Sequence, residues 1–383
     1  MIGELNMNDI DERRSLYFLM STGLFSNNTL KKLRDVYGSY HGIYAAHESR
    51  LSSDIKENVL PKLTTARQRT DIEYEYSRLA DKQISFVMYE DDDYPERFRQ
   101  LSDAPRAILV RGRLPLVSIP SVAIIGARNC SNYGRSMTRE YASLIAKCGI
   151  QVISGMAMGI DGIAGQAALD NGGDSFAVLG SGPDICYPSC NQNLYDNLVS
   201  HGGIISEYTL GTPGVGWHFP MRNRLISALS DAVIVIEAKE KSGTMITVDS
   251  ALEQGKDIYA LPGRGCDLLS RGCNRLIRQG AGILTSPEDF ISEFITGVAS
   301  TPEYSSFISS FGRKDSKEDM IFDSPHEKII YDSLDHDPQS LDDIYARTCD
   351  RITLTFPEIM VCLNDLCIKG LATNICGTYY ARK

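Results

Sequence analysis

Two arginines that flank one asparagine, Arg222-Asn223-Arg224, are the residues of this sequence most suited to binding an anion. They lie in the stretch FPMRNRLISALSD (219–231), directly before an apolar helical segment and the strand-like segment AVIVIEA. A guanidinium group keeps its charge, so it cannot be buried there without a partner. The partner is either a carboxylate of the protein or the phosphate chain of a ligand, and the remaining sequence must decide between them.

A second group of residues with anion-binding geometry follows the apolar segment VAIIGA (122–127). Gly126, Arg128 and Ser131 stand between this segment and a helical stretch. Backbone N–H groups and the positive end of the helix would then face the carboxyl edge of the sheet. Such an edge attracts anions.

Three further glycine-containing turns join a strand to a helix in the same way: VISGMAMGID (152–161), VLGSGPDICYP (178–188) and EKSGTMITVDSAL (240–252). None of these turns has the GxGxxG or GxxxxGK[ST] spacing of dinucleotide and P-loop sites. A sheet edge with several exposed amide groups and the arginines at 128, 222 and 224 suits a run of phosphates.

Each of these features also has a purely structural interpretation. Glycine turns occur in any doubly wound sheet because they let strand and helix pack closely. Asp161 could serve only as a helix N-cap, and Arg128 could pair with Glu140 or Glu237 on the surface. The aromatic residues near these turns could stack on bases or belong to the core; they are Tyr133, Tyr187, Trp217 and Phe219. We expect the segment around Arg222 and Arg224 to be extended, and one of the two arginines to be structural.

The elements that must position these residues follow from the hydrophobic pattern. Short apolar runs alternate with helix-compatible segments from residue 83 onward, which predicts an α/β domain with a parallel sheet covered on both faces. Residues 9–80 have helical periodicity and predict a small helical bundle. A stretch rich in Ser and charge, 297–323, predicts a linker. The C-terminal residues predict three helices and a hairpin around Gly377, a winged helix-turn-helix.

Composition limits the function classes. The chain has 383 residues, 43% of them hydrophobic, and a net charge of -10. Nucleic acid would therefore have to bind to a local basic patch rather than through overall attraction. No apolar leader or membrane-spanning run is present, so we expect a cytoplasmic protein. The ten cysteines are scattered without metal-ligand spacing, so we expect reduced thiols, no metal site and no cofactor.

The order and spacing of several motifs over residues 83–290 resemble the DNA-processing protein A (DprA/Smf) family. The matching stretches include GARNCSNYG, SGMAMGID, AVLGSGPDICYP, FPMRNRLISALS, SGTMITVDSALEQGKDIYALPG and GCNRLIRQGA. The resemblance implies an extended Rossmann-like core at 81–296. It also implies a helical SAM-like domain at 1–80 and, after the 297–323 linker, a winged-helix domain at 324–383.

The resemblance further implies a homodimeric, non-enzymatic protein that binds single-stranded DNA. Such a protein protects incoming DNA and loads a RecA-type recombinase during natural transformation and recombination. Arg128 matches the family's Gly-x-Arg phosphate-binding arginine. The DNA-binding residues implied by the family motifs are Gly126, Arg128, Ser131, Gly155, Gly159, Arg222, Asn223 and Arg224.

The sequence departs from the family pattern near this site. Met158 replaces the usual arginine, Gly165 replaces a histidine, and Thr209 replaces a proline. Many members have lysine after Tyr-Pro, whereas Ser189, Cys190 and Gln192 follow here. These changes remove positive charge, which lowers the expected DNA affinity.

Two other functions fit parts of the sequence. The turn 240–252 is similar to the PGGxGTxxE turn of nucleoside-monophosphate glycosidases of the lysine-decarboxylase-like family, which would make the protein a nucleotide-hydrolysing enzyme. The double glycine is missing, however, and Asp249 stands in place of the glutamate, so hydrolysis lacks its main acid-base group. A winged helix could also regulate transcription, but acidic residues outnumber basic ones from Pro325 to Lys383, which favours contact with protein over duplex DNA.

Overall fold

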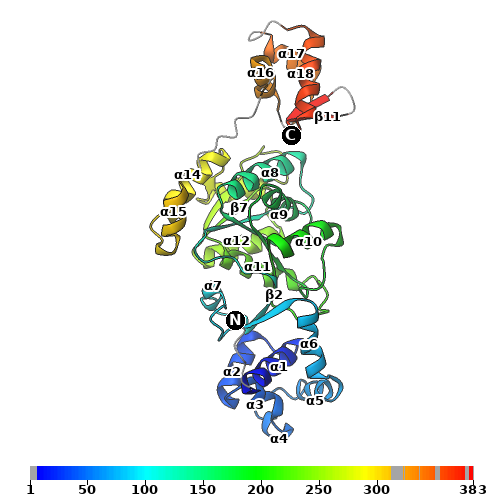
Figure 1. Ribbon diagram of the computed structural model, residues 1–383, viewed down its shortest axis with the longest axis vertical. Helices are drawn as coiled ribbons and strands as arrows, with labels where there is room; N and C mark the ends of the chain where they lie inside the picture. Colours follow the sequence, from blue (N-terminus) through cyan, green and yellow to red (C-terminus); the bar gives the residue numbers. More distant parts are fainter. Residues whose placement is uncertain are drawn as a thin grey trace.

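The structure is a computed structural model that describes residues 7–311, 322, 324–335, 337–349, 354–375 and 379–382. Its centre is a nine-stranded sheet in the order β1-β2-β6-β5-β4-β3-β7-β8-β9 (Figure 1). The strands are β1 Ile84–Met88, β2 Ala107–Gly112, β3 Ser121–Ile125, β4 Gln151–Ser154, β5 Ser175–Leu179, β6 Gly202–Ser206, β7 Ala232–Val235, β8 Asp257–Ala260 and β9 Gly282–Ile283.

The sheet is mostly parallel, as the alternating pattern predicted. In the part of the sheet that runs β6-β5-β4-β3-β7-β8-β9, every pair of neighbouring strands is parallel. The pairs β1–β2 and β2–β6 are antiparallel. All residues of β3 and β5 are buried. Strands this apolar need a helical layer on both faces.

Helices cover both faces of the sheet (Figure 1). One face packs against α7 Glu96–Arg99, α11 His218–Leu229, α12 Gly243–Glu253 and α13 Arg271–Arg278. The other packs against α8 Asn132–Lys147, α9 Ile160–Asp170 and α14 Pro287–Val298, and α10 Gln192–His201 lies over β5 and β6. The turns that join these strands to the helices lie together at the carboxyl ends of the central strands.

The N-terminal helices form the predicted bundle and share a core with the first two strands. They are α1 Met7–Ser21, α2 Asn27–Tyr37, α3 Tyr40–Ala45, α4 Glu48–Leu51, α5 Leu60–Arg69 and α6 Ile72–Asp81. The side chains of Ser26, Ser39 and Asp71 cap three of them by accepting backbone N–H bonds. Phe86 and Leu109 of the sheet lie in the same apolar cluster as Leu16 and Phe18 of α1.

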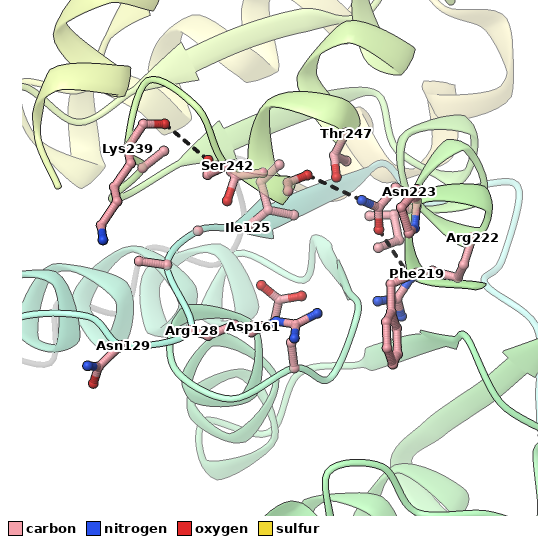
Figure 2. A pocket seen from close by; sticks show the side chains of 18 of the residues that line it. Ile125, Arg128, Asn129, Asp161, Phe219, Arg222, Asn223, Lys239, Ser242 and Thr247 are labelled. Carbon is pink, nitrogen blue, oxygen red and sulfur yellow. Dashed lines mark hydrogen bonds between the residues drawn. The ribbon is translucent and has the colours of Figure 1, made fainter. Parts of the chain in front are cut away.

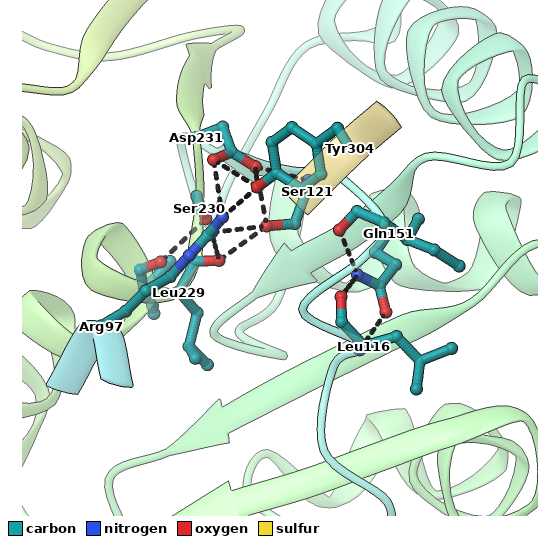
Figure 3. A network of polar contacts seen from close by, with 10 residues as sticks. Arg97, Leu116, Ser121, Gln151, Leu229, Ser230, Asp231 and Tyr304 are labelled. Carbon is teal, nitrogen blue, oxygen red and sulfur yellow. Dashed lines mark hydrogen bonds and ion pairs between the residues drawn. The ribbon is translucent and has the colours of Figure 1, made fainter. Parts of the chain in front are cut away.

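The segment that the sequence predicted as a linker is helical in its first part. It holds η2 Pro302–Tyr304 and α15 Ser305–Phe311, and Phe307 packs against the sheet domain. Tyr304 is buried, and its hydroxyl donates to Asp231 at 2.8 Å, an acceptor that it shares with Arg97 of α7 (Figure 3). Residues 297–311 therefore belong to the packed sheet domain, because these polar contacts hold them there.

The C-terminal elements form a separate small core. They are α16 Pro325–Ser333, β10 Gln339–Ser340, α17 Leu341–Thr348, α18 Phe356–Ile368, β11 Ala372–Ile375 and β12 Tyr379–Arg382. The three strands pair in the order β10-β12-β11, and β11 and β12 are antiparallel. Gly377, around which we predicted the hairpin turn, lies outside the described residues.

Candidate nucleic-acid interface

A cleft of about 860 Å³ opens at the carboxyl ends of β3 and β7 (Figure 2). From β3 the chain continues through α8 to β4 on one side, and it returns later to β7 on the other. Such a reversal of strand order is where doubly wound sheets bind their ligands. The walls come from the turn after β3, the start of α11, and the turn between β7 and α12.

Arg128 is the cleft's exposed guanidinium. Its carbon Cζ lies 5.2 Å from the centroid of the Phe219 ring, a cation–π contact. Among the described residues, its side chain has no hydrogen bond and no carboxylate within ion-pair distance. The alternative pairing with Glu140 or Glu237 is therefore not made, and Arg128 keeps its donors for a ligand.

Arg222 lies beneath the cleft and is 4% exposed. Its Nη1 donates to the carbonyl oxygen of Gly155 at 2.9 Å and to that of Val178. Burial lowers the pKa of Arg222 to about 10, although the nearby Asp161 carboxylate opposes this shift. Arg222 thus remains charged at neutral pH and ties the ends of β4 and β5 to α11.

Asp161 is the counter-charge of this buried site and is not a helix N-cap. It is the second residue of α9, and its Oδ2 accepts the N–H of Gly155 at 2.9 Å. Burial raises the pKa of Asp161, while the Arg222 charge and the Gly155 N–H act to lower it. A Cβ on Gly155 would stand 2.7 Å from both the Arg222 Nη2 and the Asp161 Oδ2, so this site needs glycine.

The other two predicted glycines are explained by packing of the turns. A Cβ on Gly126 would lie 2.7 Å from Ile160 Cγ1. Gly159 has a φ of +77°, and a Cβ there would lie 2.3 Å from the carbonyl oxygen of Ala127. Both glycines let the turn after β3 pack against the turn that begins α9, and in this way they set the position of Arg128.

The N-terminus of α8, which we expected to face an anionic ligand, holds a carboxylate of the protein. Glu237 follows β7, is buried, and accepts the Ser131 N–H at 2.8 Å and the Ser131 hydroxyl at 2.5 Å. The Ser131 Oγ in turn accepts the Gly134 N–H at 3.0 Å. Ser131 is therefore a helix cap whose donors are already used.

The helix N-terminus that does open into the cleft is that of α12. Ser242, Gly243 and Thr244 line the cleft, and no side chain caps this helix among the described residues. Lys239, exposed in the same turn, lines the cleft as well (Figure 2). The sequence indicated this turn by its glycine, but reasoning from the sequence did not single out Lys239.

Arg224 lies outside the cleft. Its Nε donates to Asp103 at 2.6 Å and its Nη2 to Glu207 at 2.9 Å. The segment we treated as extended belongs to α11, where residues two apart point in nearly opposite directions. Asn223, between the two arginines, does line the cleft and accepts from Arg222 Nε at 3.3 Å.

Aromatic side chains form one wall of the cleft. Phe219 stacks on Tyr187 with 5.3 Å between the ring centroids, and both line the cleft. Trp217 is 67% exposed, whereas Tyr133 packs against the apolar core. An anion-binding edge beside exposed ring faces suits a ligand with phosphates and bases.

Within the described ranges, His, Cys, Asp and Glu side chains form no group that could hold a metal ion. None of the helices in those ranges has the length and hydrophobicity that crossing a bilayer requires.

The family described as DNA recombination-mediator protein A matches residues 85–295 of this chain. The DNA processing protein DprA of Streptococcus pneumoniae is 42% identical over 205 residues, which span 53% of this chain and 72% of that protein. The DNA processing protein DprA of Bacillus subtilis is 34% identical over 252 residues, 63% of this chain and 85% of that protein.

Solved structures agree with these sequence relatives. The X-ray structure of DNA processing protein A from Streptococcus pneumoniae superposes with a TM-score of 0.63 and 32% identity, over 73% of this chain and 97% of that one. A structure of DNA processing protein A from Helicobacter pylori, which gives insight into its single-stranded DNA binding mode, has a TM-score of 0.52 and 32% identity. It covers 56% of this chain and 97% of the other.

Proposed function

This chain belongs to the DNA recombination-mediator protein A family, and we propose that its cleft binds single-stranded DNA. The observation that carries the proposal is Arg128, exposed over Phe219 with no carboxylate partner among the described residues. Its guanidinium donates to a phosphate, while Phe219 and Tyr187 offer ring faces to unpaired bases. Stacking of this kind requires single strands, because bases of a duplex are already stacked.

The remaining predicted residues have supporting roles in this proposal. Lys239 and the N-terminus of α12 add positive potential on the opposite wall of the cleft. Arg222 and Gly155 form the floor, and Gly126, Gly159 and Ser131 fix the turns around Arg128. Asn223 contacts a base or sugar from the start of α11. Arg224 does not contact the strand in this proposal. It stabilises the fold around the cleft through its ion pairs with Asp103 and Glu207.

The wider role that we propose is that of the family. The protein protects incoming single strands in the cytoplasm and loads a RecA-type recombinase on them in natural transformation and recombination. We propose a homodimer, for which the exposed apolar side chains of Leu252 on α12 and Ile283 on the edge strand β9 offer a surface. The α1–α6 bundle serves as a SAM-like domain and residues 324–383 as a winged helix that contacts protein.

We propose a binding protein rather than an enzyme. Among the described residues that line the cleft, the carboxylate is Asp161, which is buried and occupied by the Gly155 N–H. Asp249, the position in the turn that resembles nucleotide hydrolases, is exposed on α12 and does not line the cleft. Release of free base from nucleoside monophosphates by the purified protein would favour the hydrolase instead.

The test is a fluorescence-anisotropy titration of labelled single-stranded and double-stranded oligonucleotides at several salt concentrations. The wild-type protein should prefer the single strand, with a slope of about -0.7 in log affinity against log salt for each phosphate contacted. Arg128→Ala should lower both the affinity and the slope. Equal binding of both forms of DNA, or an Arg128→Ala variant that binds like wild type, would refute a single-strand site in the cleft.

A further inference from the structure

A second hollow, a groove of about 600 Å³, continues from the cleft along helices α8 and α9. Arg128 and Asn129 line both the cleft and the groove, so the two hollows adjoin at these residues. The helices α8 and α9 lie side by side in the layer on one face of the sheet (Figure 1). A ligand that extends beyond the cleft has this groove as a path past Arg128.

Two arginines of α8, Arg135 and Arg139, line this groove. Both are exposed, and neither side chain has a hydrogen bond or an ion pair among the described residues. They are four residues apart, which is one turn and about 6 Å along the helix axis. With Arg128 they place three guanidinium groups that have no carboxylate partner among the described residues in the lining of one groove, on a protein whose net charge is -10. Arg97 and Arg224 of the same domain, in contrast, are paired with carboxylates.

The rest of the groove lining mixes polar with apolar side chains, and its carboxylate is that of Asp170. Gln166, Asn171 and Asn193 line the groove, and the Asp170 carboxylate accepts from Gln166 Nε2 at 2.7 Å. Among the described residues that line the groove none is aromatic, in contrast to the cleft with Phe219 and Tyr187. The groove therefore suits a phosphate backbone, whereas the cleft suits bases.

We propose that a single DNA strand held in the cleft leaves it past Arg128 and runs along this groove, with its phosphates against Arg135 and Arg139. This inference rests on the proposed function of the cleft. Contacts to the backbone alone carry no sequence information, so the groove lengthens the site and adds affinity without adding sequence preference. A strand in the groove also extends the protected segment beyond the bases that stack in the cleft.

The experiment measures binding of an oligothymidylate of about 30 nucleotides to the full chain as salt is varied. Loss of two phosphate contacts in Arg135→Gln/Arg139→Gln should make the slope shallower by about 1.4 and lower the affinity on the order of 10-fold at about 0.1 M salt. Arg135→Lys/Arg139→Lys should recover most of the slope, because lysine keeps the charge.

The matched control is Lys31→Gln/Lys32→Gln. These lysines are exposed on α2, far from α8 (Figure 1), and their removal changes the net charge by the same amount. If the control lowers the affinity and slope as much as the groove variant does, general attraction explains the result and the groove path is refuted. If wild type binds and Arg128→Ala impairs binding but the groove variant matches wild type, the groove path alone fails. If wild type binds no single strand, the proposed function fails as well.

Discussion

The carboxylate of Glu237 accepts both the backbone N–H and the hydroxyl of Ser131, at 2.8 and 2.5 Å. Glu237, which follows β7, thus binds the N-cap residue of α8, the helix that follows β3. The anion site that the sequence indicates at this turn is filled by the protein itself. Positive charge in the cleft comes instead from Arg128, from Lys239 and from the start of α12.

Ser131→Ala should therefore affect folding more than DNA binding. The variant loses the cap to the Gly134 N–H and one bond to Glu237, which should lower the free energy of unfolding by about 1 to 2 kcal/mol. Urea denaturation measures this loss. The single-strand affinity of the folded variant should stay within about twofold of wild type. A large loss of affinity with unchanged stability would place Ser131 in direct contact with the strand.

Phe219 provides the second prediction. Its ring lies under Arg128 and against Tyr187, so Phe219→Ala removes the platform for a base and also the cation–π contact. Stacking of one base contributes about 1 to 3 kcal/mol, so single-strand affinity should fall about 5-fold to more than 100-fold. Phe219→Tyr keeps the ring face and should bind nearly as well as wild type. If Phe219→Ala and Phe219→Tyr bind alike, the ring makes no stacking contact with the strand.

Asp161 should give the protein a measurable pH dependence. Burial raises its pKa in the folded state above the unfolded value of about 3.9. The stability contributed by this group is then complete below about pH 4 and is lost as the pH rises through the raised pKa. Asp161→Asn does not titrate. Relative to wild type, its free energy of unfolding should therefore increase with pH, by at most about 1.4 kcal/mol per pH unit.

Urea titrations of wild type and Asp161→Asn at several values from about pH 4 upward measure this difference. Asp249→Asn is the matched control, because it removes one carboxylate at an exposed position of α12, outside the buried site. A difference that falls with rising pH would mean that the Arg222 charge outweighs burial. The pKa of Asp161 would then lie below its ordinary value.

Most of the architecture follows from local patterns in the sequence, whereas the pairing of charges does not. Continuous apolar runs such as SVAII of β3 and AVIV of β7 predict strands of a parallel sheet. In the structure both strands are buried on both faces. Helix α11 begins earlier than the apolar pattern of the sequence predicts. The helix begins at His218, and Pro220 near its first turn does not prevent this.

The charge partners could not be predicted, because they come from distant parts of the chain. Ser131 meets Glu237 across 106 positions, and Arg224 meets Asp103 across 121. No local pattern encodes such a contact. From the sequence, Arg128 and Arg222 are equally good candidates for phosphate binding. The structure distinguishes them, because Arg128 is exposed and Arg222 is buried.

Arg224 tests whether an arginine that lies outside the cleft contributes to folding but not to DNA binding. Burial alone would lower its pKa, but the carboxylates of Glu207 and Asp103 raise it above the ordinary value, so the guanidinium stays charged between them. Arg224→Met keeps the apolar stem and leaves two carboxylates without their partner. Breaking a buried pair costs about 3 to 5 kcal/mol, and the partial exposure of Asp103 should bring the loss toward the lower figure.

If Arg224 acts only in folding, the loss in Arg224→Met should be reduced when its partners are neutralised together, as in Arg224→Met/Asp103→Asn/Glu207→Gln. The single-strand affinity and salt slope of these folded variants should match wild type, in contrast to Arg128→Ala. Charge alone cannot produce such a contrast, since both substitutions remove one arginine. A shallower slope in Arg224→Met at unchanged stability would instead show that the strand reaches the far side of α11.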